Sequence, residues 1–137
     1  MKDNLLDIEN VTVKYKVKTG NLFFNRYNDF KAIDRVSFTL APSETLGLVG
    51  ESGCGKSSLA RAIVKLVRLE SGKVTWLGKD WTLSQKNEDS QFKENIQLVF
   101  QDPLASLNPR MTVSEIISEP LENYRRELTS LQKKELV

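Results

Sequence analysis

Residues 50–58 read Gly-Glu-Ser-Gly-Cys-Gly-Lys-Ser-Ser, and this stretch decides the fold. The apolar run TLGLV precedes it at 45–49, and the sequence LARAIVKLV follows it at 59–67. These patterns predict a strand before the stretch and a helix after it. The glycines, Lys56 and Ser57 fit the spacing of the phosphate-binding loop, G-x-x-x-x-G-K-[ST], which requires that strand and that helix as its flanks.

The residue types in this loop suit a polyphosphate anion. Backbone N–H groups can surround phosphate oxygens only where no Cβ intrudes, and Gly50, Gly53 and Gly55 provide that freedom. A helix that starts near Lys56 adds unpaired N–H groups and the positive end of its dipole. We expect the Lys56 ammonium to reach the β- and γ-phosphates, and the Ser57 hydroxyl to face Mg²⁺. The alternative is a glycine-rich turn with a solvated lysine, which the flanking strand and helix disfavour.

Length and charge narrow the class of protein. The 137 residues suggest one ordinary globular domain, and 20 basic against 18 acidic residues leave a net charge of +2. This balance gives no reason to expect nucleic acid as a partner. No apolar run approaches the roughly 18 residues that span a bilayer, and the start, MKDNLLDIEN, is too acidic and broken for a signal peptide. We therefore expect a cytosolic protein.

The chain has one cysteine, Cys54, and no histidine. These counts exclude an internal disulfide, a Cys/His zinc site and a Ser-His or Cys-His nucleophile within this chain. Cys54 lies inside the phosphate loop, where it is either a reactive thiol or simply a small residue that fits. If nucleotide binds there, alkylation of Cys54 is expected to block it sterically.

Five segments are predicted strands: residues 5–15, 32–41, 45–49, 73–77 and 96–100. Apolar residues alternate with polar ones at 11–15 and 32–41, which is typical of strands with one buried face. Residues 45–49 and 96–100 are apolar at most positions, which is typical of strands covered on both faces in a parallel sheet. A long hairpin or loop is expected to connect the first two strands.

The polar segment at 84–95 predicts a short surface helix. Residues 113–119 predict a helix that stops at Pro120, because proline cannot donate an N–H to the helix. A final helix is expected to follow a cap at Thr129 or Ser130 and to run to the last residue of the sequence.

Two longer segments extend the phosphate-loop pattern: GLVGESGCGKSSLARAI at 47–63 and VFQDPLASLNPRMTVSEII at 99–117. Together with a tyrosine on the upstream strand, they resemble the ATP-binding subunit of an ABC transporter. The SLNPRMT run is similar to the oligopeptide and dipeptide import branch, although nickel and glutathione importers have similar loops. The resemblance covers essentially all of residues 4–137.

This resemblance implies an α/β fold, the P-loop NTPase fold of ABC ATPases, in incomplete form. Residues 1–101 would form an antiparallel β subdomain and the first part of a parallel-sheet core. Residues 102–137 would form the loop that follows Gln101 and the start of the helical subdomain.

The resemblance also implies roles for single residues. Tyr15 is expected to stack on adenine, and Gln101 to contribute to Mg²⁺ or the attacking water and to sense the γ-phosphate. An amide can bind Mg²⁺ through its carbonyl oxygen while staying uncharged beside a phosphate. The alternative for Tyr15 is a tyrosine that packs on the face of its strand. The alternative for Gln101 is a solvated loop residue. The implied catalytic residues are Lys56 and Gln101, and the implied metal ligands are Ser57 and Gln101. The implied nucleotide-binding residues are Tyr15, Gly50, Glu51, Ser52, Gly53, Cys54, Gly55, Lys56, Ser57 and Ser58.

The implied cofactors and partners are those of such a transporter: ATP, Mg²⁺, a second ABC ATPase subunit in a heterodimer, and two transmembrane permease subunits. The implied location is the cytoplasmic face of the inner membrane, as a peripheral protein. No nucleic-acid partner is expected.

The chain departs from the family pattern downstream of Gln101. Such subunits need an LSGGQ-type signature, an acidic strand end with a catalytic glutamate, and a switch histidine, and the sequence has no match to these. It resembles the first two-fifths or so of a peptide-importer subunit. We expect ATP binding with slow or absent hydrolysis by this chain alone, and a marginal or dimeric fold because apolar strands lack neighbours. The alternatives are a phosphate-loop kinase, and a non-hydrolysing chain that binds only nucleotide or partner subunits.

Overall fold

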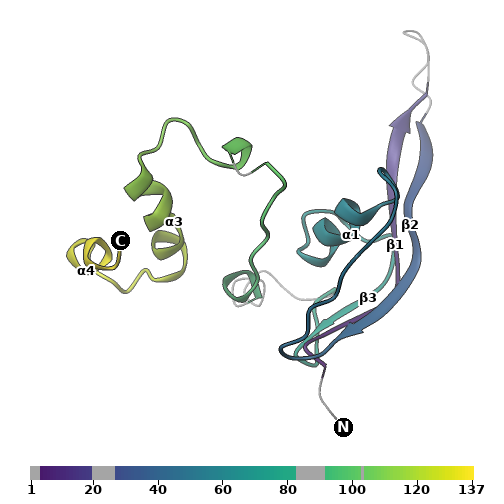
Figure 1. The fold of residues 1–137 in the computed structure, drawn as a ribbon, viewed down its shortest axis with the longest axis horizontal. Helices are drawn as coiled ribbons and strands as arrows, with labels where there is room; N and C mark the ends of the chain where they lie inside the picture. Colours follow the sequence, from purple (N-terminus) through teal and green to yellow (C-terminus); the bar gives the residue numbers. More distant parts are fainter. Residues whose placement is uncertain (1–3, 20–26, 83–91, 103) are drawn as a thin grey trace. The chain divides into compact units, whose positions relative to one another are not determined.

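The computed structural model describes residues 4–19, 27–82, 92–102 and 104–137. The chain folds as two compact units, Met1–Asp89 and Ser90–Val137. The first unit contains the described strands and the phosphate loop, and the second is helical or irregular where it is described (Figure 1).

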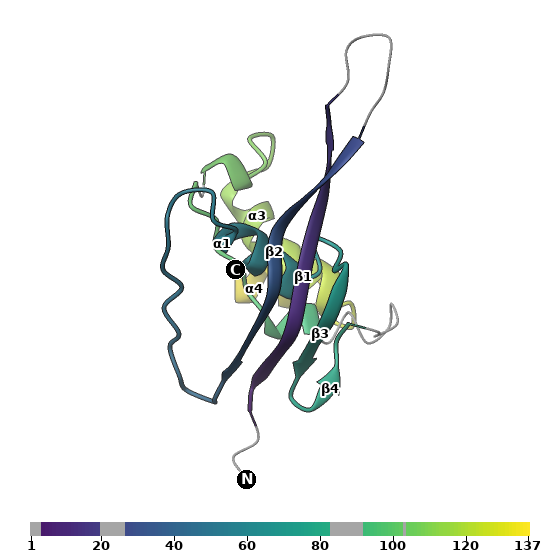
Figure 2. The ribbon, with the colours of Figure 1, turned by 90° about the vertical axis from the view of Figure 1, so that its right-hand side faces the viewer.

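A four-stranded antiparallel sheet forms the frame of the first unit. Its strands are β1 (Leu6–Lys18), β2 (Tyr27–Leu40), β3 (Ser71–Trp76) and β4 (Lys79–Asp80). They lie in the order β2-β1-β3-β4, with β1 between β2 and β3 (Figure 2). The predicted strands at 5–15, 32–41 and 73–77 are therefore confirmed as β1, β2 and β3. The two long strands reach further into the connection than predicted, to Lys18 and from Tyr27, and residues 20–26 lie outside the described residues.

The buried core of the sheet lies on β1 and β3. Ile8, Val11, Val13 and Val74 are the large side chains with the least exposure. Ile8 and Val11 are three positions apart, so simple alternation would point them to opposite faces. The pairing of β1 with β2 shifts register between them, and Asn10 has a φ of 48°. This β-bulge restarts the alternation, so that both residues are buried.

Of the described helices, α1 (Lys56–Ile63) lies against this sheet, beside β1 and β2 (Figure 1). Its buried residues are Leu59 and Ala62. Burial of a side chain as large as that of Leu59 contributes roughly 1.5–3 kcal/mol, and the methyl group of Ala62 contributes less. The helix ends where the Trp81 indole N–H donates to the Ile63 carbonyl at 2.9 Å. The start of the helix, immediately after the phosphate loop, is therefore fixed by the core.

Two predicted strands are wrong, because residues 45–49 and 96–100 are not strands in the structure. Val49 is 91% exposed and Val99 is 84% exposed. An apolar segment becomes a buried strand only when neighbouring strands satisfy its backbone and cover its faces. No strand of the described sheet pairs with either segment, so the described sheet has no parallel part. Residues 41–55 instead run back from the end of β2 to α1 (Figure 2).

In its described residues the second unit contains a 3-10 turn, η1 (Leu104–Ser106), and the helices α3 (Val113–Tyr124) and α4 (Ser130–Leu136), besides a short helical stretch at 92–95. The helices pack on each other, and Lys133 pairs with Glu122 at 2.7 Å. Residues 92–95 are helical, in agreement with the predicted helix at 84–95, whose earlier part lies outside the described residues. Among the helices in the described ranges, none is long and apolar enough to cross a membrane.

Both helices of this unit begin with a capping box. The Thr112 hydroxyl accepts from the Glu115 N–H at 3.3 Å, and the Glu115 carboxylate accepts from the Thr112 N–H at 2.7 Å. Thr129 and Gln132 repeat the arrangement at the start of α4. These bonds satisfy N–H groups that the first helical turn leaves free. The predicted cap at Thr129 is confirmed.

The predicted stop at Pro120 is wrong, because α3 continues through it to Tyr124. A proline inside a helix removes one hydrogen bond, here to the Ile116 carbonyl, and costs about 3 kcal/mol. The capping box at Thr112 and the contacts of α3 with α4 act in the opposite direction, although no residue of α3 is buried. Local sequence alone shows only the penalty.

Candidate functional site

The phosphate loop turns sharply through three glycines. Gly50, Gly53 and Gly55 have φ values of 156°, 82° and 103°, conformations that glycine adopts more readily than other residues. A Cβ on Gly55 would overlap the carbonyl oxygen of Ala32 on β2. Gly55 therefore permits both the left-handed turn and the close approach of the loop to the sheet.

The N-terminus of α1 opens onto this loop without a cap. Gly55 is the N-cap residue, so no side chain bonds the first amides, and the first turn contains no acidic residue. The first intrahelical bond runs from the Leu59 N–H to the Gly55 carbonyl at 2.9 Å. The N–H groups before Leu59 have no acceptor within the helix, and together they favour an anion.

The Lys56 ammonium lies across the loop. It donates to the carbonyl oxygens of Gly50 at 2.7 Å and Glu51 at 2.6 Å, and it lies 3.5 Å from Cys54 Sγ. The ammonium therefore braces the loop while it stays on the exposed side. The loop now presents backbone N–H groups, one ammonium and hydroxyls, and this donor set fits a polyphosphate.

Two serines follow the lysine in the first turn of α1. Ser57 is exposed, so its hydroxyl is accessible to a ligand. Ser58 is half-buried, and its Oγ accepts a hydrogen bond from the Tyr15 hydroxyl at 3.1 Å. The structure thus brings Tyr15, from β1, to the last residue of the loop, 43 positions away. Its stacking on adenine stays a prediction.

Gln101 lies in the other unit, at an exposed bend after residues 96–100. Its role at the metal therefore stays a prediction. In the part of the chain that the structure describes, no group of three or more His, Cys, Asp and Glu side chains could hold a metal ion. Magnesium here would take its ligands mainly from phosphate oxygens and water, with the Ser57 hydroxyl as a protein ligand, which is its usual mode with nucleotides.

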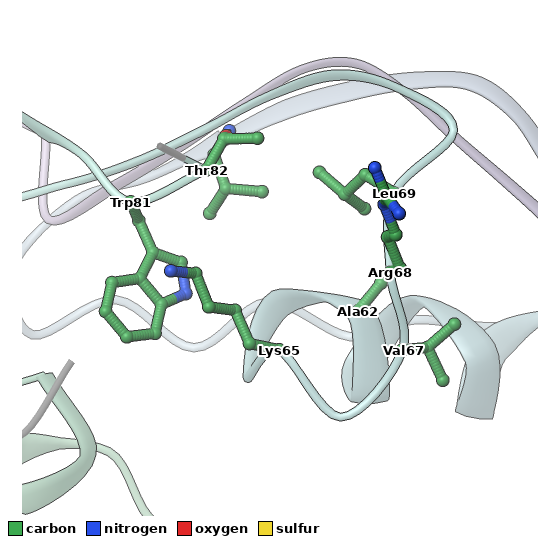
Figure 3. A pocket seen from close by; sticks show the side chains of 8 residues that line it. Ala62, Lys65, Val67, Arg68, Leu69, Trp81 and Thr82 are labelled. Carbon is green, nitrogen blue, oxygen red and sulfur yellow. The ribbon is translucent and has the colours of Figure 1, made fainter. Parts of the chain in front are cut away.

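Two cavities flank α1. The one beside the loop has a volume of about 240 Å³ and is lined by residues of β2, the loop and α1, including Cys54, Gly55 and Lys56. A larger cavity of about 390 Å³ lies between the far end of α1 and the β3–β4 hairpin (Figure 3). There the Lys65 ammonium lies 4.0 Å from the centre of the Trp81 ring. Size alone would favour the larger cavity, but the Lys56 ammonium and the uncapped amides of α1 lie at the loop.

Sequence reasoning missed the pairing of Tyr15 with Ser58 and the role of Trp81 at the end of α1. Both join residues of different elements, and no periodicity or spacing encodes such a contact. The only signal for the first pair is that each residue belongs to the predicted nucleotide site.

Comparison with known proteins identifies the family. Residues 33–136 match the family model described as ABC transporter. The chain belongs to the ABC transporter family. It is 47% identical over 137 residues to the oligopeptide transport ATP-binding protein OppF of Haemophilus influenzae, covering 99% of this chain and 41% of that protein. It is 50% identical over 126 residues to OppF of Salmonella typhimurium, covering 91% and 38%. The chain thus spans about two-fifths of the length of these relatives.

Solved structures of ABC cassettes share the fold. One is a dimeric ATP-binding cassette in a post-hydrolysis state, bound to ADP and Pi, with a TM-score of 0.74 and 24% identity. The match covers 95% of this chain and 53% of that one. Another is a nucleotide-free cassette, with a TM-score of 0.62 and 25% identity over 95% of this chain and 44% of that one. The α/β ABC ATPase fold, in partial form, is confirmed.

Proposed function

We propose that this ABC-family chain binds ATP with Mg²⁺, as the nucleotide-binding part of an importer subunit for peptides. The observation that carries the proposal is the Lys56 ammonium, held across the loop by the Gly50 and Glu51 carbonyls beside an uncapped helix N-terminus. The printed names of the relatives, oligopeptide transport ATP-binding proteins, support the class of solute. Nickel and glutathione are the alternative solutes.

In this proposal each part of the loop has one task. The amides of residues 50–58 hold the phosphates, and the Lys56 ammonium exchanges its two carbonyl partners for phosphate oxygens. Bound Mg²⁺ would neutralise part of the phosphate charge, with Ser57 and Gln101 as its protein ligands. Tyr15 would stack on the adenine. Residues 1–101 would make up the nucleotide-binding body, and 102–137 the glutamine loop and the start of the helical subdomain.

The proposed assembly is that of an ABC importer on the cytoplasmic face of the membrane. A second ABC ATPase subunit and two transmembrane permease subunits would be the partners. The dimeric ATP-binding cassettes of the same fold support the first of these. The relatives named as transport proteins support the second.

We further propose that the 137-residue chain alone binds ATP but turns it over slowly or not at all. Phosphoryl transfer to water needs an oriented nucleophile and stabilisation of the developing charge as well as a phosphate cradle. Lys56 and Ser57 supply only the cradle. The competing proposal, a chain that binds nucleotide or partner subunits without any hydrolysis, predicts no turnover under any condition.

Isothermal calorimetry with MgATP tests the proposed function. Wild type is expected to bind, and Lys56→Ala to bind about 10- to 100-fold more weakly, because a charge-assisted bond contributes about 1.5–3 kcal/mol. Lys79→Ala, which removes an exposed cation on β4, is the matched control and is expected to bind as wild type does. The proposal fails if folded wild type takes up no MgATP, or if Lys56→Ala binds as tightly as wild type. Phosphate transfer to a small acceptor would instead indicate a kinase.

A further inference from the structure

We infer that Tyr15 is a positioning residue that acts through its hydroxyl: it orients the Ser58 hydroxyl as a hydrogen-bond donor toward bound phosphate. The inference rests on the proposed nucleotide site and adds a second role for Tyr15, separate from stacking of its ring. Its basis is the 3.1 Å hydrogen bond from Tyr15 Oη to Ser58 Oγ.

Both ends of this hydrogen bond are attached to packed elements. Tyr15 lies opposite Phe30 in the β1–β2 ladder, two positions after Val13, which is fully buried. Ser58 precedes Leu59, which is 4% exposed and packs α1 on the sheet. The contact is therefore set by the core rather than by a loose loop, as a positioning interaction requires.

The direction of the bond follows from the acidity of the two hydroxyls. A phenol is a stronger hydrogen-bond donor than an aliphatic alcohol, so Tyr15 donates and Ser58 accepts. A serine hydroxyl has one proton and two lone pairs. Once one lone pair of Ser58 is occupied, its own proton is left to point at another acceptor.

The neighbourhood of Ser58 indicates which acceptor that is. Ser58 follows Ser57 and Lys56 in the first turn of α1, where the uncapped amides also point. A ligand at this place that carries many acceptor oxygens is a phosphate chain. A hydroxyl that accepts one bond while it donates another is polarised, so Tyr15 strengthens the bond from Ser58 to phosphate. Phenylalanine at position 15 would keep a ring for stacking and lose this effect.

The ring and the hydroxyl of Tyr15 therefore make different predictions. A stacking ring acts on the base and has no effect on a ligand that lacks one. A hydroxyl that acts through Ser58 affects any phosphate chain in the loop, with or without adenosine.

Calorimetry on the 137-residue chain separates the two, with MgATP and magnesium tripolyphosphate as ligands. Tyr15→Phe is expected to weaken binding of both ligands by the same factor, about 3- to 10-fold, the effect of one ordinary hydrogen bond. Ser58→Ala is expected to weaken both at least as much. In the Ser58→Ala background, Tyr15→Phe is expected to have no further effect, because its route to the phosphate is gone. Tyr27→Phe, on the exposed end of β2, is the matched control and is expected to change nothing.

The outcomes distinguish this inference from the proposed function. If wild type binds MgATP but Tyr15→Phe weakens neither ligand, or weakens MgATP alone, the hydroxyl has no positioning role and the nucleotide site stands. If the losses from Tyr15→Phe and Ser58→Ala simply add, Tyr15 acts through the stability of β1, and the inference is again overturned. If tripolyphosphate binds too weakly to measure, the double-mutant cycle on MgATP decides by the same additivity criterion. If folded wild type binds neither ligand, the proposed function fails and the inference fails with it.

Discussion

Replacing Gly55 by alanine is expected to destabilise the first unit more than the same change at any other glycine outside the sheet. Gly55 has a φ of 103°, a conformation that alanine adopts at a cost of about 1–2 kcal/mol. The new Cβ would also overlap the Ala32 carbonyl of β2, and relief of such overpacking costs typically 1–3 kcal/mol. The expected loss is about 2–5 kcal/mol, a large part of the roughly 5–15 kcal/mol that stabilises a whole domain.

Two glycines of the same unit serve as controls. Gly78, in the β3–β4 turn, has a φ of 75° and nothing within 4 Å of its would-be Cβ, so Gly78→Ala isolates the backbone cost. Gly47 has nothing within 4 Å and no positive φ, so Gly47→Ala is expected to be neutral or stabilising by a few tenths of a kcal/mol, because alanine reduces the entropy of the unfolded chain. The three substitutions should therefore rank Gly47, Gly78, Gly55 in increasing cost.

Urea unfolding followed by circular dichroism measures this ranking. The variants should share the slope of the wild-type transition and differ in its midpoint. If Gly55→Ala is no more destabilising than Gly78→Ala, the contact between the loop and β2 is not as the structure describes it. The argument that glycine is needed there for close approach would then be refuted.

Alkylation of Cys54 is expected to abolish MgATP uptake in calorimetry, because Cys54 Sγ lies 3.5 Å from the Lys56 ammonium and the adduct would fill the loop; unchanged affinity after complete modification would contradict this. Thr112→Ala is expected to cost about 1 kcal/mol and to lower the helical circular dichroism signal, since it removes the cap of α3, whereas Thr112→Ser should retain it. Hydrogen bonds from Thr112 hold the pKa of Glu115 below its ordinary value of 4.5, so the stabilisation is fully present above pH 4.5 and is lost as the pH falls through the lowered pKa. Acid titration of α3 helicity should therefore show a transition below pH 4.5 that Glu115→Gln reduces. Phosphate-release assays on the 137-residue chain are expected to show little turnover, and ordinary enzyme rates that Lys56→Ala abolishes would overturn that expectation.

Local patterns predicted the parts of the fold that depend on local physics. Alternation gave β1 and β2 because each has one face on the core, and hydroxyl chemistry gave the cap at Thr129. The turns of the loop at 50–58 were predicted from its glycines, because positive φ values depend on the local residue type. In each case the feature depends on the same few neighbouring residues from which it was predicted.

Predictions failed where the outcome depends on residues far away in the sequence. Residues 45–49 and 96–100 have strand-like composition, but a strand needs partners that the described sheet does not provide. Pro120 penalises α3 locally, yet α3 continues through it and contacts α4, which lies further along the chain. The bond between Tyr15 and Ser58 joins two elements, so neither sequence neighbourhood contains a sign of it.

The position of Lys56 bears on the free energy with which a ligand could bind. Its ammonium already spans the loop, so the main chain around it is preorganised before any anion arrives. In the proposed function, binding of an anion would exchange these two carbonyl acceptors for phosphate oxygens, so the bonds that brace the empty loop would be given up. The net affinity would then depend on how far the charged acceptor exceeds the two neutral ones in strength.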